Sequence, residues 1–283
     1  MPALDHIVLL VPHGVLQALP AWLTGALTVI PGGQHAGGVT ENQLVLFQDG
    51  FYIEIIAFVG GSGSDEEDTR RRRGHRWGGK PDGHIIDWAV GLAGTLEETD
   101  KEFSEIQKNV GAAGAKLAYK DLVAGGRTTP DGVVLKWATA SPTAVPEGSE
   151  DVTGLLPFWC LDRTDRKLRV PYATQPELAQ HPSGAIGVAG VILHISDEAL
   201  VERLRKIYNV LFGESKGDEW KLAVPESSFK HAPTLKIAHD KTQQNGAGQG
   251  WIELALFSTG PALTVGSSFV EGWRVDILLV HVD

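Results

Sequence analysis

Residues 4–11 read LDHIVLLV, a short apolar run with one histidine, His6, near its start. A run of Ile, Val and Leu of this length, ended by Pro-His-Gly, is typical of a buried β-strand rather than of a helix. We therefore expect His6 on a rigid element, where a sheet fixes the direction of its imidazole ring. The rest of the chain can be interpreted by asking which groups that imidazole faces.

The segment that follows predicts a first β-α-β-β-β module. Residues 14–30 have apolar side chains at helix-like spacing, interrupted by Pro20. The runs 42–48 (NQLVLFQ) and 51–58 (FYIEIIAF) are separated by Asp-Gly, which is a strong signal for a β-hairpin. A shorter strand is expected around 38–40.

The same order of elements recurs in the next part of the chain. We expect a strand at 85–92, a charged amphipathic helix at 96–113, and further strands at 133–138 and 156–161. Repetition on this scale indicates a modular fold.

A third, fainter copy follows. Strands are expected at 189–195, 234–238 and 251–257, with a helix at 197–212 that Ser196 would cap. Residues 250–257 (GWIELALF) match 51–58 closely, and a last strand is expected at 273–282. We therefore divide the chain into a domain of residues 1–183, with a linker loop at 60–80, and a C-terminal module of residues 184–283.

The loop at 60–80 differs in character from its neighbours. It has a Gly/Ser-rich start, then the run DEEDTRRRR. The simplest interpretation is a solvated surface loop whose opposite charges partly neutralise one another. A nuclear-localisation or phosphate-binding role for Arg70 to Arg73 is the alternative.

The composition limits the classes of function. The chain has 283 residues, 42% hydrophobic residues and a formal net charge of −10, which disfavours nucleic acid or an anionic membrane as the main partner. We expect a cytoplasmic protein, monomeric or homodimeric, that binds a small molecule. Cys160 is the only cysteine, so a thiolate cluster within one chain is excluded, and a metal site would depend on His, Asp and Glu.

His6 in the first predicted strand and Glu54 in the last strand of the same module are the main candidates for chemistry. If both face the concave side of a curled sheet, an imidazole and a carboxylate meet there, which is half of a site for a divalent ion. The alternative is that the two side chains only pair with each other. Burial in an apolar barrel would raise the pKa of Glu54 toward a range useful for proton transfer.

These segments carry a family resemblance. LDHIVLLVP, FYIEIIAF and the repeated βαβββ unit resemble the vicinal-oxygen-chelate superfamily, which includes glyoxalase I, extradiol dioxygenases and fosfomycin-resistance enzymes. The later runs GHRWGGKPDGHIIDWAV, GRTTPDGVVLKWA and LPFWCLDRTDRKLRVP look like the glyoxalase-like domain proteins. The resemblance implies an α+β fold in which βαβββ modules form an open, cupped β-barrel, with a third module at the C-terminus.

The resemblance also implies metal ligands on the first and last strands of each module. His6 and Glu54 match these positions in module one. In module two the alignment places Asp87 and Cys160 there, with His84 as a substitute. In module three Glu253 matches, whereas Gly190 stands where the histidine would be. His84, Asp87 and Glu253 are therefore weaker metal candidates.

Four further residues are candidates for substrate binding. Trp88 and Trp137 suit a flat or apolar substrate, although core packing is the simpler role for Trp77, Trp88, Trp137 and Trp159. Arg127 could hold a carboxylate or phosphate, or could be a loop residue. His181 belongs to the HPSG segment of the resemblance and could also be structural.

We expect a glyoxalase-like enzyme that uses a divalent ion, Zn, Ni, Mn or Fe, for isomerase- or lyase-type proton transfer on an oxygenated substrate. Glu54 would be the metal ligand or base, and no nucleotide cofactor is expected. The first alternative is a metal-free protein that sequesters a small molecule. The second is an iron-dependent ring-cleaving dioxygenase, although such a site usually needs a second histidine.

Overall fold

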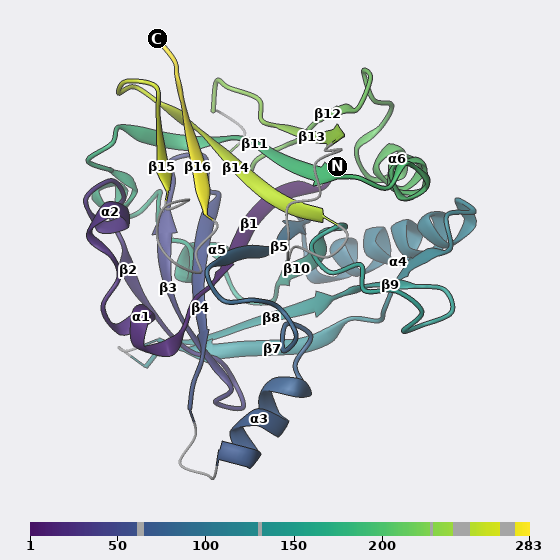
Figure 1. Cartoon of the computed structure of the whole chain (residues 1–283), viewed down its shortest axis with the longest axis horizontal. Coiled ribbons are helices and arrows are strands. Elements are labelled where there is room, and N and C mark those ends of the chain that lie inside the picture. The colour runs from purple at the N-terminus through teal and green to yellow at the C-terminus, as the bar shows by residue number, and fades with distance from the viewer. Residues whose placement is uncertain (61–64, 130–131, 227–228, 240–249, 267–274) are drawn as a thin grey trace.

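The structure is a computed structural model, and it describes residues 1–60, 65–129, 132–226, 229–239, 250–266 and 275–283. Two large sheets dominate it, one of eight strands and one of six, with helices α4 and α6 beside each other at one side (Figure 1). The predicted α+β fold of repeated modules is confirmed. Within the described residues, no helix is long and apolar enough to cross a membrane.

Module one forms one half of the eight-stranded sheet. Its elements are β1 (Ala3–Leu10), α1 (His13–Gln17), α2 (Ala21–Thr24), β2 (Ile30–Gln34), β3 (Thr40–Leu46) and β4 (Tyr52–Phe58). The helical segment is broken at Pro20, as expected, and the Asp-Gly hairpin joins β3 and β4. Of the short strand expected around 38–40, only Thr40 lies in a strand, as the first residue of β3, and residues 38 and 39 form a bend before it.

Module two forms the other half. Its elements are β5 (His84–Gly91), α4 (Leu96–Ala112), β7 (Val123–Thr128), β8 (Val134–Ala140) and β10 (Phe158–Asp162), with a small separate sheet of β6 (Leu117–Tyr119) and β9 (Pro142–Ala144). Strand β7 was not predicted, because VAGGRT lacks alternating apolar residues.

The eight strands run in the order β2-β3-β4-β1-β5-β10-β8-β7. In each module the closing strand lies parallel to the first, β4 beside β1 and β10 beside β5, and the two modules join through antiparallel β1 and β5. The sheet curls until its edge strands meet. An isolated bridge joins His35 to Arg127, and the amide of Ala36 donates to the carbonyl of Gly126 at 2.9 Å. The result is the expected cup.

The C-terminal sheet contains β11 (Ala185–Ile195), β12 (Glu219–Lys221), β13 (Thr234–His239), β14 (Gly250–Ser258), β15 (Leu263–Gly266) and β16 (Asp276–His281), with helix α6 (Glu198–Phe212). Its order is β12-β13-β11-β14-β16-β15. Strand β14 lies antiparallel to β11 and parallel to β16. Strand β14 therefore lies beside β11 as β5 lies beside β1. It does not take the position of the closing strand β4, although its sequence resembles that of β4. The proposed boundary between residues 183 and 184 stays a prediction.

Two local expectations are corrected. The segment 60–80 is not all loop, because DEEDTRRRR forms helix α3 (Asp65–Arg73). The helix has no apolar face to reveal it, but acids at its start and arginines at its end complement the helix dipole. Helix α6 is capped by Asp197, whose side chain accepts from the amides of Ala199 and Leu200, and not by Ser196.

Alternation along the strands separates the core from the cup interior. In β1, Ile7 and Leu9 pack into the large core between the sheets, whereas Val8 and Leu10 belong to a cluster on the other face. His6 shares the face of Val8 and Leu10 because side chains alternate along a strand. The first strand thus directs its histidine into the cup.

Candidate metal and substrate site

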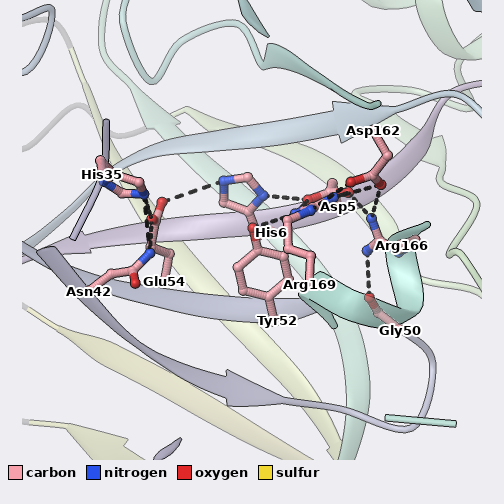
Figure 2. A network of polar contacts seen from close by, with 10 residues as sticks. All are labelled: Asp5, His6, His35, Asn42, Gly50, Tyr52, Glu54, Asp162, Arg166 and Arg169. Atoms are coloured by element: carbon pink, nitrogen blue, oxygen red, sulfur yellow. Dashed lines mark hydrogen bonds and ion pairs between the residues drawn. The ribbon is translucent and has the colours of Figure 1, made fainter. Parts of the chain in front are cut away.

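His6 and Glu54 meet inside the cup, as Figure 2 shows. The Nε2 atom of His6 lies 3.7 Å from a carboxylate oxygen of Glu54. Both residues are buried, with 3% and 5% of their surfaces exposed. The parallel register of β1 and β4 pairs His6 with Tyr52, whose ring stacks on the imidazole with centroids 4.6 Å apart. The sheet therefore brings together the two residues that the sequence singled out.

A buried charge network fixes the orientation of His6 (Figure 2). Nδ1 of His6 lies 2.5 Å from Asp5 Oδ1. Asp5 also accepts from both terminal nitrogens of Arg169, at 3.1 and 3.0 Å, and from Arg166. Burial opposes the charge on Asp5, but Arg166, Arg169 and His6 together hold its pKa well below the usual value.

The ionised Asp5 can only accept hydrogen bonds, so Nδ1 of His6 must carry the proton. The lone pair of a neutral His6 is then on Nε2, on the side of Glu54. A carboxylate that orients a histidine in this way is a common partner of metal-binding histidines.

Glu54 is surrounded by donors. Asn42 Nδ2 donates to Glu54 Oε1 at 2.5 Å, and Nε2 of His35 lies 3.4 Å from the same oxygen. Burial alone would raise the pKa of Glu54, but His35, His6 and Asn42 outweigh it and lower the pKa to about 2. The expected rise in this pKa is thus wrong. An ionised carboxylate of this kind is a better ligand than a proton acceptor.

The strand register explains why module two does not supply a matching pair. Tyr52 pairs with His6, and Glu54 follows two residues later. In module two Phe158 pairs with Ala89, and Cys160 follows two residues later. Ala89, rather than Asp87, therefore occupies the place of His6. The three described side chains whose nitrogen atoms contact the Glu54 carboxylate, Asn42, His6 and His35, come from module one.

A second cluster, Asp5, His6 and Cys160, also brings three donor atoms within 4.8 Å of one another. It suits a cation poorly. Asp5 is already bound by two guanidinium groups, which would repel a cation. Burial raises the pKa of the Cys160 thiol, which keeps it protonated.

The donors around Glu54 suit a cation better. Ligand atoms about 2.1 Å from one metal ion are about 3–3.5 Å apart. The separations of 3.7 Å to His6 and 3.4 Å to His35 are close to that range. Each imidazole is therefore at a ligand-like distance from the Glu54 carboxylate, His6 from Oε2 and His35 from Oε1, although the three donor atoms are not all within 4.8 Å of one another.

These groups form the floor of an open cavity of about 570 Å³. Module one supplies one wall, module two supplies another, and the segment after α3 supplies a third. Two of the predicted substrate-binding residues, Arg127 and Trp137, line it. Other lining residues are His75, Arg76, Trp77, Ser141, Phe158 and Cys160.

The remaining candidates do not line this cavity. Trp88 is fully buried and donates to the carbonyl of Gly154 at 3.1 Å. Asp87 is also buried and accepts from the indole of Trp77 at 2.7 Å. His84 lines a different cavity, between the two large sheets.

The last two candidates have partners elsewhere. Glu253 pairs with His194 at 2.6 Å in the C-terminal sheet. In His181, Nδ1 accepts from the amide of Thr28 at 3.0 Å, and Nε2 donates to the carbonyl of Leu46 at 2.9 Å. These contacts give His181 a structural role.

The sequence did not indicate His35, Asn42 or Arg76. His35 and Asn42 follow no pattern typical of a site, and His35 reaches Glu54 across strand β3, through the pairing of β2 with β3 and of β3 with β4. Arg76 falls within the segment expected to be a solvated loop. The GHRW motif, a histidine, an arginine and an indole together shortly before a buried strand, is the signal that could have found it.

The comparisons with known proteins agree with this fold. The family model described as glyoxalase-like domain matches residues 4–208. The chain therefore belongs to the glyoxalase-like domain family, and the resemblance found in the sequence is confirmed. The search among curated proteins found no match.

Solved structures of several kinds resemble the chain. A hypothetical protein from Staphylococcus aureus has 12% identity and a TM-score of 0.63, with 100% of both chains covered. This likeness shows the fold alone. A 2,2',3-trihydroxybiphenyl 1,2-dioxygenase from Sphingomonas wittichii has 12% identity and a TM-score of 0.44, covering 99% of this chain and 90% of that one. Glyoxalase I from Zea mays has 13% identity and a TM-score of 0.31, covering 99% and 92%.

Proposed function

We propose that this chain is a small-molecule enzyme that uses a divalent metal ion, held by His6 and Glu54 with His35 as a third donor. The observation that carries the proposal is the ionised, buried Glu54 carboxylate between two imidazoles on the floor of an open cavity. Zn, Ni, Mn and Fe all accept such nitrogen and oxygen ligands. The proposed reaction class is isomerase- or lyase-type proton transfer.

A bound divalent ion would polarise two neighbouring oxygens of a substrate as a Lewis acid. The residues of the chain have other tasks. Asp5 holds the His6 proton on Nδ1, and Trp137 and Phe158 give the cavity apolar walls that orient a flat molecule. The low pKa of Glu54 makes it a ligand rather than the base.

His75 is a cavity residue that can donate a hydrogen bond to the substrate. Burial, followed by the charge of Arg76, lowers its pKa to about 4, so it is neutral at pH 7. Its Nδ1 accepts from the amide of Trp77 at 3.3 Å, which leaves the proton on Nε2. A neutral imidazole of this kind can donate a hydrogen bond to a substrate oxygen.

Metal analysis tests the proposal. Purified protein is equilibrated in turn with Zn, Ni, Mn and Fe(II), desalted and measured by elemental analysis. We expect about one ion per chain in the wild type, and loss of that ion in His6→Ala and Glu54→Gln. His84→Ala is the matched control and keeps the ion, because His84 lies in another cavity.

Two results would contradict the proposal. One is stoichiometric metal that persists in both the His6 and the Glu54 variant. The other is wild-type protein that retains none of the four metals while remaining folded. The second result would instead support a protein that sequesters a small molecule without a metal.

The position of His35 favours a second candidate, an iron-dependent ring-cleaving dioxygenase. Two histidines and one carboxylate are the usual ligands of non-haem Fe(II) in oxygenases. His35 supplies the second histidine, which was missing from the ligands predicted from the sequence. The test is oxygen uptake by Fe(II)-loaded protein with a catechol. Uptake that is lost in His35→Ala supports this candidate, and iron-bound protein without uptake excludes it for that substrate.

A further inference from the structure

Arg76 is held against aromatic rings at the wall of the same cavity. Its guanidinium carbon lies 3.8 Å from the ring centre of Phe158 and 4.2 Å from that of Trp77. Its Nη1 donates to Ser141 Oγ at 3.1 Å. A guanidinium has five N–H donors, and among the described residues only this one hydrogen bond from Arg76 is found.

Most other arginines of the chain's interior differ from Arg76. Arg169, Arg166, Arg163 and Arg72 each pair with an aspartate. Arg127, which lines the same cavity, is the exception: it donates to the carbonyl of Gly32 and forms no ion pair with a described carboxylate. Within the described parts of the chain, no carboxylate lies within 4.0 Å of the nitrogens of Arg76. A sheltered guanidinium without a carboxylate partner is costly unless a ligand supplies the charge.

Asp87 and Glu54 are the carboxylates whose charges act on Arg76 from a greater distance, and both are hydrogen-bonded to other groups. Asp87 accepts from the indole of Trp77 and from the amide of Trp88. Glu54 is bonded to Asn42 and faces two imidazoles. The negative charge that would best satisfy Arg76 must therefore come from the cavity.

We propose that Arg76 binds the carboxylate of a flat, oxygenated organic anion, which is the substrate class of this cavity. This inference rests on the proposed function, because it concerns the same cavity. The planar guanidinium can hold a carboxylate through two parallel hydrogen bonds. Trp137, half-buried on the cavity wall, offers a ring against which the flat body of the anion packs. The other end of the anion then lies toward the donors around Glu54.

Calorimetric titration with a matched pair of probes, salicylate and 2-hydroxybenzyl alcohol, tests the inference. The two molecules differ mainly in the carboxylate. Because a charge-assisted hydrogen bond adds affinity, we expect the wild type to bind salicylate about tenfold more tightly than 2-hydroxybenzyl alcohol, or better. Arg76→Gln removes this preference. Arg73→Gln is the matched control, because Arg73 is exposed on α3 and carries the same charge.

A second variant protects the test against misfolding. Ser141→Ala removes the hydrogen bond that orients Arg76 and should reduce the preference for salicylate in part. Thermal unfolding checks that each variant is folded. Equal binding of both probes to the wild type, binding of neither, or a preference that survives in Arg76→Gln would each overturn the inference.

The experiment is repeated on metal-loaded protein, on chelator-treated protein and on Glu54→Gln. A preference that depends on Arg76 in all three supports the anion site, even if the metal proposal fails. A preference that depends on the metal and not on Arg76 assigns the carboxylate to the metal ion. That result overturns this inference and leaves the proposed function standing.

Discussion

The substitution Asp5→Asn tests the charge network behind His6. Asp5 is 1% exposed and accepts from both nitrogens of the Arg169 fork, from Arg166 and from His6. Asparagine keeps the shape but loses the charge. It also turns one acceptor into an amide donor that faces a guanidinium.

The magnitude follows from the burial of the network. Removing one partner of a buried ion pair costs about 3–5 kcal/mol, because the other charge stays buried. Asp162 still contacts Arg169, with two nitrogen–oxygen distances of 2.8 Å, so the arginines keep one partner. For a chain of this size we expect the melting temperature to fall by roughly 6–20 °C. Metal affinity should fall about 10–100-fold, since His6 loses its orienting carboxylate.

Denaturant and thermal unfolding measure this loss. Asp100→Asn is the control, because Asp100 pairs with Arg163 at the surface and is 45% exposed. That substitution should cost about 1 kcal/mol or less. A loss for Asp5→Asn no larger than the loss for Asp100→Asn would refute the argument that the network is buried and that it holds His6.

Two further predictions concern the stability of the chain. Burial raises the pKa of Asp49 to about 7, although the amides of Val188 and Phe51 donate to it. The pKa of Asp49 is higher in the folded chain than in the unfolded chain, so Asp49 stabilises the fold at low pH. This contribution to the free energy of unfolding is lost as the pH rises from about 4 through 7, and it amounts to about 4 kcal/mol at most. Urea unfolding at pH 5 and pH 8 should show a smaller pH difference in Asp49→Asn than in the wild type, and an unchanged difference would contradict the prediction. His181→Ala removes two hydrogen bonds and should cost about 1–3 kcal/mol while metal content stays the same; a loss of metal at unchanged stability would place His181 in the site after all.

Local patterns were enough to predict most of the fold. The alternating and apolar runs indicated β1, β4, β5 and β10, and the Asp-Gly pair indicated the hairpin of module one. Pairing between distant strands was harder. Strand β14 resembles β4 in sequence, yet it pairs antiparallel with β11, because a strand's own pattern does not record its partner.

The proximity of His6 and Glu54 was predictable, because two rigid strands determine it. His6 and Glu54 lie on adjacent parallel strands, and an imidazole and a carboxylate are side chains that by their type alone suggest chemistry. His35 was not predictable, because it reaches Glu54 across β3 from the end of strand β2, and β2 was not predicted from the sequence. The pKa of Glu54 was misjudged because burial could be inferred from the sequence, whereas the donors Asn42 and His35 could not.

The central claim is that His6 and Glu54 hold a metal ion inside the cup. Anomalous X-ray diffraction from crystals of metal-loaded protein, recorded on both sides of the metal's absorption edge, tests it most directly. The account predicts one strong peak about 2.0–2.2 Å from His6 Nε2 and from a Glu54 carboxylate oxygen. A peak between Asp5 and Cys160, or no peak in the cavity, would contradict it.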